Sequence, residues 1–488
     1  MGLAVLCFFI PAFAHAQDRL QELRDDLTGI VSDTNFSNAT WAVAMQSVKT
    51  GEDLFVFNEN KSLLPASCFK LLTAAEALAL LGPEFRYRTE FLTTGKITDG
   101  KVKGYPAKIL TGDLLIRGSG DPTFGVDSTF GYSVLWGLSS QDIHKISGRI
   151  IGDDSYFTSD VYPLGWAVED LPYYYAPQIS GLNFERNQAT LTVYSGESIG
   201  DPANFDFSAE GPEFVGVDLK NIATTSGDSI SAIDLSRKIG TNTITIGGKI
   251  ALDGESVDQS ASIENPTLHT VQAVTGMLRE SGSIVTKEAL TTRDLKVTYP
   301  YDKARVIAVD TSLSLSEIVK AMDKESDNMY AECLFRTVAK EIGGEGSWTK
   351  GAFIMKNFLG SLGCDTARIA ISDGSGLSRM DLISAHDFVT LLRAMPDKTS
   401  MWDAFYNSLP IAGVDGTLIN RMKGTAAEGN VHAKTGSMTG VRSICGYLTT
   451  RDGEQLAFSI IGNNYTASGH SANELEDRIL LRLVDFSR

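Results

Sequence analysis

The segment that most constrains the fold of this chain is residues 65–70, Pro-Ala-Ser-Cys-Phe-Lys, which precedes a run of Leu, Ala and Glu. Proline disfavours helical geometry at the residue before it, and serine is common where helices begin. The segment therefore predicts a loop that becomes a helix at Ser67 and ends near Leu81, before Gly82. Ser67 and Lys70 are three residues apart, so their side chains share one face of that helix.

Ser67 and Lys70 have the chemistry of a nucleophile and its base. A serine hydroxyl is a weak nucleophile at neutral pH, but an amine whose pKa is lowered by burial can take its proton. The positive end of the helix favours the negative charge that then develops. The Ser-x-x-Lys pattern recurs at Ser347 and Lys350, in what reads as an ordinary surface helix. A catalytic role for Ser67 therefore depends on partners elsewhere in the chain.

Two later motifs supply such partners. The first, Ser-Asp-Asn at 326–328, lies between two predicted helices and places a hydroxyl and an amide at their junction. The second, Lys-Thr-Gly-Ser at 434–437, lies in a predicted strand. In that strand Lys434 and Gly436 share a face, and a glycine lets another backbone approach closely.

The order and the settings of the three motifs carry more weight than any motif alone. They occur at a helix start, at a helix–helix junction and in a strand with a following antiparallel partner. Second copies of the later motifs, Ser-x-Asn at 471–473 and a Lys-Thr-Gly hairpin turn at 49–51, lack this order or setting. Ser326 by itself could also be a simple helix cap. The ordered set is that of penicillin-binding proteins and class A β-lactamases.

Over essentially its whole mature length the chain resembles the D-alanyl-D-alanine carboxypeptidase/endopeptidases of the class C low-molecular-mass penicillin-binding proteins, the type-4 group. In that family a long insertion separates the first two motifs, as the step from Lys70 to Ser326 does here. Residues 373–379 resemble the family's DGSGLSR segment, and residues 176–183 resemble the segment after its substrate-pocket loop.

The resemblance implies a mechanism through an acyl-enzyme. Ser67 would attack the carbonyl of the penultimate D-alanine, with Lys70 as general base. The backbone N–H groups of Ser67 and Ser437 would bind the oxyanion. Ser326 would pass the proton to the leaving amine, and Asn328 would hold the substrate amide.

The same resemblance assigns the remaining site residues. Lys434 would keep the site electropositive, and Gly436 would belong to the substrate-binding residues. Thr435 and Ser437 would bind the substrate carboxylate. A further pocket would be lined by the three residues Asp170, Tyr175 and Arg379.

In that pocket, Asp170 would bind the amino group of a diaminoacyl side chain. Asp170 stands in an aromatic, loop-like stretch at 166–178. Whether Trp166 belongs to the pocket is left open. Tyr173 and Tyr174 could equally serve only in the packing of a subdomain.

The predicted fold class is α/β (α+β): a transpeptidase-like domain of the serine β-lactamase and penicillin-binding-protein type, an antiparallel sheet flanked by helices, with a large strand-rich insertion. The length is typical of about three domains. Residues 17–88 and 307–488 should form the catalytic domain, and 89–306 the insertion. Inside the insertion we expect two nested subdomains, about 89–118 with 222–306, and 119–221.

Local patterns give the expected elements. The predicted strands are 40–48, 53–58, 87–92, 107–117, 190–194, 222–223, 243–246, 370–372, 431–435, 441–449 and 456–462; the predicted helices are 18–31, 67–81, 315–322, 328–342, 348–362, 384–395 and 474–486.

Residues 1–16 form an apolar run that ends in Ala14-His15-Ala16, an A-x-A cleavage pattern followed by polar residues. This favours a secretory signal peptide, although the usual positive n-region is missing and the true start stays open. A short hydrophobic arm is the alternative. We therefore expect a periplasmic, exported protein, soluble or loosely membrane-associated, without an integral membrane span.

Charge and composition limit the other partners. The formal net charge of −17 and the lack of a basic cluster argue against nucleic acid. Six scattered histidines without HExxH predict no metal, and no cofactor is expected. The four cysteines beyond the leader, Cys68, Cys333, Cys364 and Cys445, are expected to be free buried thiols, with disulfides after export as the alternative. Peptidoglycan stem peptides are the expected substrates and β-lactams the expected covalent inhibitors, and a homo-oligomer stays open.

Two other functions share the motifs. A serine β-lactamase would carry all three, but those enzymes resemble one compact unit without the inserted block. A penicillin-recognising binding or sensor domain would be acylated without useful turnover. Against it, the sequence contains no transmembrane or signalling segment.

Overall fold

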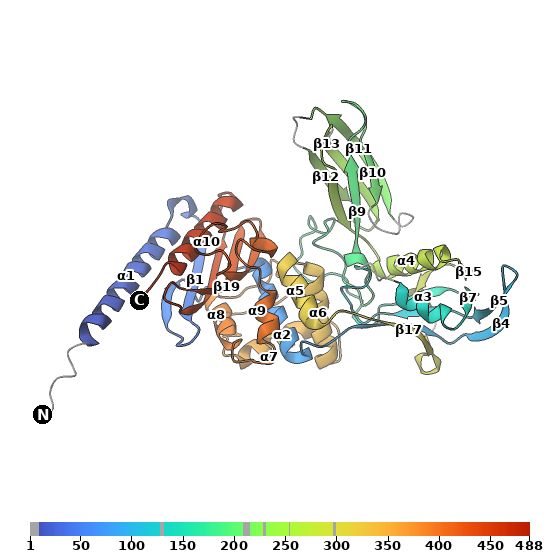
Figure 1. Ribbon diagram of the computed structural model, residues 1–488, viewed down its shortest axis with the longest axis horizontal. Coiled ribbons are helices and arrows are strands. Elements are labelled where there is room, and N and C mark those ends of the chain that lie inside the picture. The colour runs from blue at the N-terminus through green and yellow to red at the C-terminus, as the bar shows by residue number, and fades with distance from the viewer. Residues whose placement is uncertain (1–8, 127–130, 208–214, 228–230, 253, 296–298) are drawn as a thin grey trace. The chain divides into compact units, whose positions relative to one another are not determined.

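The computed structural model describes residues 9–126, 131–207, 215–227, 231–252, 254–295 and 299–488 (Figure 1). The chain divides into two compact units. The first unit comprises Met1–Phe85, Leu315–Val338 and Trp348–Arg488, and the inserted unit comprises Arg86–Ser314 and Ala339–Ser347. All three predicted motifs therefore belong to the first unit.

A five-stranded antiparallel sheet forms the centre of the first unit, in the order β18-β19-β20-β1-β2. Strands from both ends of the sequence meet where β1 pairs with β20 along its whole length. The predicted strands of this sheet are confirmed, with ends that differ by a few residues. Their bounds are β1 Thr40–Ser47, β2 Asp53–Phe57, β18 His432–Met438, β19 Val441–Thr449 and β20 Gln455–Asn463.

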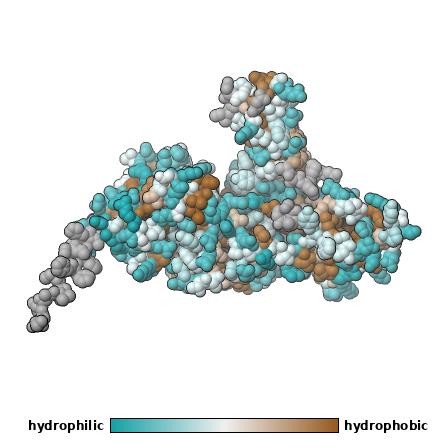
Figure 2. Space-filling view, viewed as in Figure 1, coloured by the Kyte–Doolittle hydropathy of each residue, from teal (hydrophilic) through white to brown (hydrophobic). Residues whose placement is uncertain are grey.

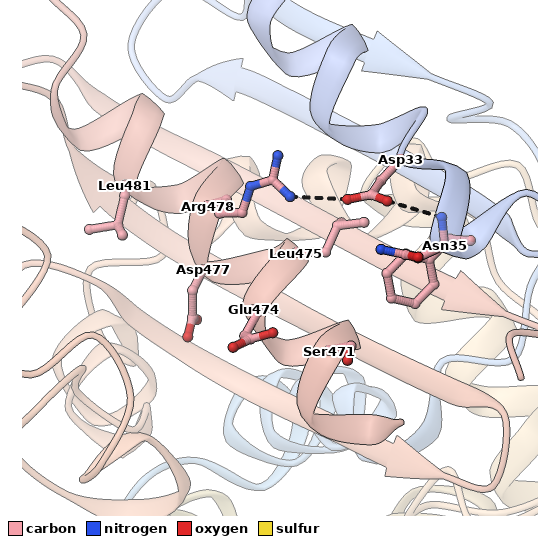
Figure 3. Close-up of a pocket in the computed structure, with 9 residues that line it drawn as sticks. Asp33, Asn35, Ser471, Glu474, Leu475, Asp477, Arg478 and Leu481 are labelled. Atoms are coloured by element: carbon pink, nitrogen blue, oxygen red, sulfur yellow. Dashed lines mark hydrogen bonds and ion pairs between the residues drawn. The ribbon is translucent and has the colours of Figure 1, made fainter. Parts of the chain in front are cut away.

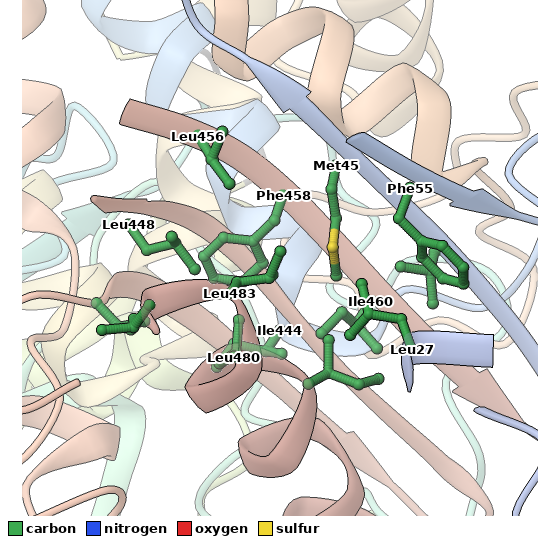
Figure 4. Packing of buried hydrophobic residues seen from close by; sticks show 14 of the residues in the cluster. Leu27, Met45, Phe55, Ile444, Leu448, Leu456, Phe458, Ile460, Leu480 and Leu483 are labelled. Atoms are coloured by element: carbon green, nitrogen blue, oxygen red, sulfur yellow. The ribbon is translucent and has the colours of Figure 1, made fainter. Parts of the chain in front are cut away.

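Helices cover both faces of this sheet, and β1 and β20 are therefore buried almost throughout. On one face, α1 (Phe9–Val31) and α10 (Gly469–Val484) pack on a hydrophobic core. Figure 4 shows side chains of both helices, such as Leu27 and Leu480, among those of the strands. On the other face lies α8 (Ala385–Ala394), which packs on β20, β1 and β19.

The other helices of the first unit carry or surround the motifs. They are α2 Lys70–Leu81, α5 Leu315–Glu325, α6 Asn328–Gly343, α7 Trp348–Ser361 and α9 Trp402–Ser408. The structure confirms the predicted helices, and α9 was not predicted. The strand predicted at 370–372 is wrong: the backbone there makes one isolated bridge, Ala370 to Leu382, because its neighbours belong to a turn-rich loop.

The inserted unit contains two groups of strands. In the first group, two sheets, β16-β8-β6-β3-β17 and β15-β7-β5-β4, share one hydrophobic core with α3 and α4. Its elements are β3 Arg88–Thr93, β4 Lys96–Val102, β5 Tyr105–Thr111, β6 Leu114–Arg117, α3 Tyr132–Ser139, β7 Ile143–Ile146, β8 Ile150–Asp153, α4 Pro266–Glu280, β15 Ile284–Val285, β16 Leu290–Thr291 and β17 Arg305–Thr311.

The second group consists of two three-stranded sheets, β10-β9-β14 and β11-β13-β12, around a core of their own. The strands are β9 Gln188–Tyr194, β10 Asn204–Phe207, β11 Gly216–Thr225, β12 Ala232–Arg237, β13 Thr243–Ala251 and β14 Val257–Ser262.

This grouping differs from the nested division expected from the sequence. Residues 143–153 join the first group because β7 and β8 pair in parallel with β5 and β6. Parallel pairs need a crossover connection, which local alternation of residues does not reveal. Helices α3 and α4 were likewise missed inside a block that reads as strand-rich.

On the face drawn in Figure 2, small hydrophobic groups are separated by hydrophilic residues. Among the described residues, none of the helices combines the length and the apolar character needed to cross a bilayer. The proposed cleavage point after Ala16 lies within α1, and residues 1–8 lie outside the described part of the chain. The four described cysteines are buried thiols, and none of them forms a disulfide within the described part of the chain, as expected.

Candidate functional site

Ser67 lies in a short 3-10 segment, Ala66–Phe69, that leads directly into α2. The segment begins one residue before Ser67, so Ser67 is not the capping residue that the sequence suggested. Ala66 has a left-handed backbone with φ of +46°, which a residue with a side chain rarely adopts. Ser67 is half-buried while both its neighbours are buried, so its hydroxyl is reachable at an otherwise closed surface.

The Lys70 ammonium is enclosed and has three hydrogen-bond acceptors. Its Nζ lies 2.9 Å from Ser67 Oγ, 2.6 Å from Asn328 Oδ1 and 3.0 Å from the Ser375 carbonyl oxygen. The side chain is completely buried. Burial, followed by the positive charge of Lys434, lowers the pKa of Lys70 to about 7. A lysine with this pKa is partly neutral at neutral pH and can accept a proton from the serine it touches.

The second motif faces the third. Ser326 has a left-handed φ of +62°, and its Oγ accepts a hydrogen bond from Lys434 Nζ at 2.8 Å. Asp327, not Ser326, caps α6, because its carboxylate accepts from the Tyr330 N–H at 3.0 Å. Lys434 is also completely buried, and burial lowers its pKa. The two serines thus each lie against a buried lysine.

Gly436 allows the edge strand β18 to approach the serine. A Cβ at this position would lie 2.6 Å from the Pro65 carbonyl oxygen and 3.0 Å from the Ser67 nitrogen. From the neighbouring strand, Ser443 Oγ donates to that same Pro65 oxygen at 2.5 Å. β18 is the edge strand of its sheet, so one of its sides has no neighbouring strand, as in sheets that bind an extended peptide.

The comparison with known proteins decides the family. Residues 23–483 match the D-Ala-D-Ala carboxypeptidase 3 (S13) family. The chain belongs to this family. The D-alanyl-D-alanine carboxypeptidase of Actinomadura sp. (strain R39) is 34% identical over 495 residues, which cover 98% of this chain and 87% of that protein. A D-alanyl-D-alanine carboxypeptidase of Haemophilus influenzae is 29% identical and covers 88% of this chain and 86% of its own length.

A solved structure agrees with this assignment. Penicillin binding protein 4 of Haemophilus influenzae superposes with a TM-score of 0.79 at 25% identity, over 95% of this chain and 99% of that chain. That protein has also been crystallised in complex with a novel β-lactam. The predicted family, fold class and activity are confirmed: this S13 protein is a serine-type D-Ala-D-Ala carboxypeptidase with the fold of penicillin binding protein 4.

Two other predicted site residues of this carboxypeptidase lie on β18, and a third lies in a separate loop. Thr435 is half-buried, and its hydroxyl donates to Thr417 Oγ1 at 2.7 Å. Ser437 is exposed at the far end of the same strand. Arg379 is exposed in the loop that follows Ser375.

Asp170 and Tyr175 lie in the inserted unit and contact each other. The Tyr175 hydroxyl donates to Asp170 Oδ1 at 3.0 Å, and its ring stacks on Tyr173 with centroids 5.5 Å apart. Burial and this hydrogen bond raise the pKa of the Tyr175 phenol, so it stays a proton donor. Arg379 belongs to the first unit, and the common pocket predicted for the three residues stays a prediction.

The sequence did not predict the residues that hold the 373–376 turn behind Lys70. Asp373 accepts from the N–H groups of Gly376 and Ser378, both at 2.7 Å, and Glu332 accepts from that of Ser375 at 2.8 Å. A Cβ at Gly376 would lie 2.0 Å from the Ala66 carbonyl oxygen, so the turn packs directly on the serine segment. The sequence signal for Glu332 was its spacing: it follows Asn328 by four residues in a predicted helix and so lies on the same helix face.

A separate hollow of about 520 Å³ lies between α10 and the 3-10 segment Thr34–Phe36 (Figure 3). Its charged groups are already paired: Arg478 bonds Asp33 Oδ2 at 3.1 Å, and Asp33 Oδ1 accepts from the Asn35 N–H. None of the predicted catalytic residues lines it. This hollow is not the carboxypeptidase site.

The close approach at Gly436 leads to a prediction. The change Gly436→Ala should slow acylation at Ser67 by at least about tenfold, because its methyl group would displace β18 from the serine segment. Stopped-flow or gel labelling with a fluorescent penicillin measures the rate. The matched control is Gly216→Ala in β11, where the nearest atom would lie 3.6 Å from the new Cβ. Equal rates for Gly436→Ala and the wild type would contradict the close approach.

Proposed function

We propose that the carboxypeptidase acts through an acyl-enzyme on Ser67, with Lys70 as the base that activates it. The observation that supports this most strongly is the position of Lys70 Nζ, 2.9 Å from Ser67 Oγ and 2.6 Å from Asn328 Oδ1. Neutral Lys70 takes the hydroxyl proton as Ser67 Oγ bonds to the carbonyl carbon of the penultimate D-alanine. The oxyanion accepts hydrogen bonds from the backbone N–H groups of Ser67 and Ser437.

The tetrahedral intermediate then collapses and expels its leaving group, the amine of the terminal D-alanine. Its C–N bond breaks, and the amine of the terminal D-alanine takes the proton that Lys70 received, by way of the Ser326 hydroxyl. Lys434 stays protonated and favours the negative charge of the transition state and of the substrate carboxylate. Thr435 and Ser437 bind that carboxylate, Gly436 lets β18 lie close to the Ser67 segment, and Asn328 holds the substrate amide. Water then hydrolyses the ester on Ser67.

The proposal extends to cross-linked substrates and to inhibitors. A D-alanyl bond inside a peptidoglycan cross-link presents the same carbonyl and an amine leaving group, so the enzyme acts as a DD-endopeptidase as well. A β-lactam acylates Ser67 and stalls, because its leaving group stays attached. Digestion of a purified cross-linked muropeptide, followed by mass spectrometry, tests the proposal. Release of both D-alanine and the separated peptides supports it, and an intact muropeptide contradicts it.

The substrate is encountered outside the cytoplasm, so the proposal includes export and cleavage after Ala16. The apolar run and its Ala14-His15-Ala16 ending support it. Edman sequencing of the protein from the cell envelope should begin at Gln17. A protein that retains residues 1–16 in the cytoplasm would contradict export.

Asp170 is proposed to select substrates with a free amino group on the side chain of the third residue. A charge-assisted hydrogen bond to an ammonium contributes roughly 1.5–3 kcal/mol. The change Asp170→Asn should therefore reduce kcat/KM about ten- to a hundredfold for a diaminopimelyl peptide. Steady-state kinetics with that peptide measure the effect.

Two controls separate recognition from folding. The same peptide with its side-chain amine acetylated never makes the contact, so Asp170→Asn should change its kcat/KM little. Penicillin acylation of Ser67 should also be unchanged, because simple penicillins carry no such amine. Equal losses for the free and the acetylated peptide would show that Asp170 only supports its loop, through its bond to Tyr175.

A further inference from the structure

The base of the proposed reaction is held from behind by the backbone of a two-residue segment, Gly374–Ser375. Its Ser375 carbonyl oxygen accepts from Lys70 Nζ at 3.0 Å. Its Gly374 carbonyl oxygen accepts from the hydroxyl of Thr73 on α2 at 2.6 Å. The position of Lys70 therefore depends on what holds this segment on its other side.

Glu332 on α6 holds that other side. Its Oε1 accepts from the Ser375 N–H at 2.8 Å and from the Gly374 N–H at 3.0 Å. Its Oε2 accepts from the Trp348 indole N–H at 2.7 Å and from the Gly374 N–H at 3.1 Å. Glu332, Lys70 and Ser375 are all completely buried. Every one of these bonds comes from an N–H group, which is the arrangement that suits an ionised carboxylate.

The negative charge of an ionised Glu332 matters because of the other charged groups around Lys70. Lys434 opposes the protonated form of Lys70, whereas Asp373, Asp327 and Glu332 favour it. Burial, followed by the charge of Asp373, raises the pKa of Glu332 overall, and the hydrogen bonds from Trp348, Ser375 and Gly374 offset only part of this rise. When Lys70 is protonated and Glu332 is ionised, the two charges stabilise each other across the Gly374–Ser375 segment.

We propose that Glu332 is a positioning residue for the general base: it holds the Gly374–Ser375 segment so that the Ser375 carbonyl fixes Lys70 beside Ser67, and its negative charge sets the pH range in which Lys70 works. This inference rests on the proposed function only in taking Lys70 as the base. The hydrogen bonds of the Glu332 side chain described above go to Gly374, Ser375 and Trp348 and not to Ser67. The effect of Glu332 on Ser67 therefore passes through the loop that contains Gly374 and Ser375.

Acylation by a fluorescent penicillin between pH 5 and pH 9 tests the proposal. The change Glu332→Gln places an amide NH₂ against N–H donors, so the maximal acylation rate should fall about tenfold or more. The acid limb of the rate profile should move to lower pH by about one unit, because a charge that favours protonated Lys70 is lost. A purely structural role would lower the melting temperature and leave the acid limb unmoved.

Three further variants sharpen the test. Thr73→Val loosens the same segment without changing charge, so the rate should fall and the acid limb should stay. Glu332→Asp keeps the negative charge on a shorter side chain, so the acid limb of its rate profile should also stay near the pH of the wild-type limb. Glu76→Gln is the matched control. Like Glu332, Glu76 is a completely buried glutamate, but it lies on α2, and its two carboxylate oxygens have no hydrogen-bond partner among the described residues. This control variant should change neither rate nor limb.

The outcomes separate this inference from the proposed function. A wild type that is not acylated at Ser67 would overturn both. An acylated wild type together with a folded Glu332→Gln protein of unchanged rate and unchanged acid limb would overturn the role of Glu332 alone. If Glu332→Gln does not fold, Thr73→Val and Glu332→Asp decide: a wild-type rate in both overturns the positioning by this segment, and a reduced rate with an unmoved limb supports it.

Discussion

Replacement of Ser67 by alanine is expected to abolish covalent labelling by penicillin and to reduce peptide hydrolysis at least about a thousandfold. The hydroxyl is the only group that the proposed mechanism joins to the substrate, and loss of a nucleophile removes the whole covalent pathway. Its half-exposed position between buried neighbours is consistent with a group that must meet substrate. Intact-mass measurement after incubation with penicillin should show one adduct on the wild type and none on Ser67→Ala.

The matched control is Ser347→Ala, at the second Ser-x-x-Lys of the chain. The Ser347 hydroxyl donates to Glu345 at 2.6 Å, and Ser347 belongs to the inserted unit, whereas the three motifs belong to the first unit. This variant should label at the wild-type rate, and peptide mapping should place the adduct on the peptide that contains Ser67. An adduct that survives Ser67→Ala would refute the assignment of the nucleophile.

Replacement of Lys70 by alanine is expected to slow acylation by at least about a hundredfold, the usual effect of losing a general base. It would also remove the partner that holds the Ser67 hydroxyl and the Asn328 amide. Stopped-flow acylation of the wild type and the variant measures the loss. The control is Lys350→Ala, the lysine of the second Ser-x-x-Lys, which should leave the rate unchanged.

The pH dependence of the wild type follows from the same lysine. Lys70 must be neutral to accept a proton, and burial lowers its pKa to about 7. The acylation rate should therefore rise with pH, with a midpoint near pH 7, and level off above it. Lys434 must stay protonated in the proposed mechanism, and burial lowers its pKa as well. As the pH rises further, the rate should therefore fall again, and this fall should begin at a pH lower than the ordinary pKa of a lysine. A flat profile from pH 5 to pH 9, or a residual acid limb in Lys70→Ala, would contradict this role.

Local patterns were sufficient for most elements of the central sheet. Strands β1, β2, β19 and β20 show the expected apolar residues, and the turns between them contain Gly51 and Gly453 with positive φ. The inserted unit was harder, because its two groups are defined by parallel pairs such as β6 with β8 and by long-range returns such as β14 onto β9. Such pairings depend on tertiary packing, which overrides local propensity.

The catalytic motifs could be read from the sequence because each requires particular residue types at close spacing. What surrounds them could not. Ser67, Lys70 and Gly436 were predicted, but the 3-10 segment at Ser67 and the left-handed Ala66 were not. The segment at 373–379 was recognised by its resemblance to the family, but its support by Glu332 was missed.

The sequence alone determined the order of the three motifs and pointed to Ser67 and Lys70 as the candidate nucleophile and base, because residue identity and short spacing are local properties of the chain. The tertiary structure decided how strong a base Lys70 is. Its acceptors Asn328 and Ser375 stand 258 and 305 residues away, and complete burial by the folded unit lowers its pKa to about 7. Desolvation and charge at one atom are sums over everything packed around it, and only the folded chain brings those groups together.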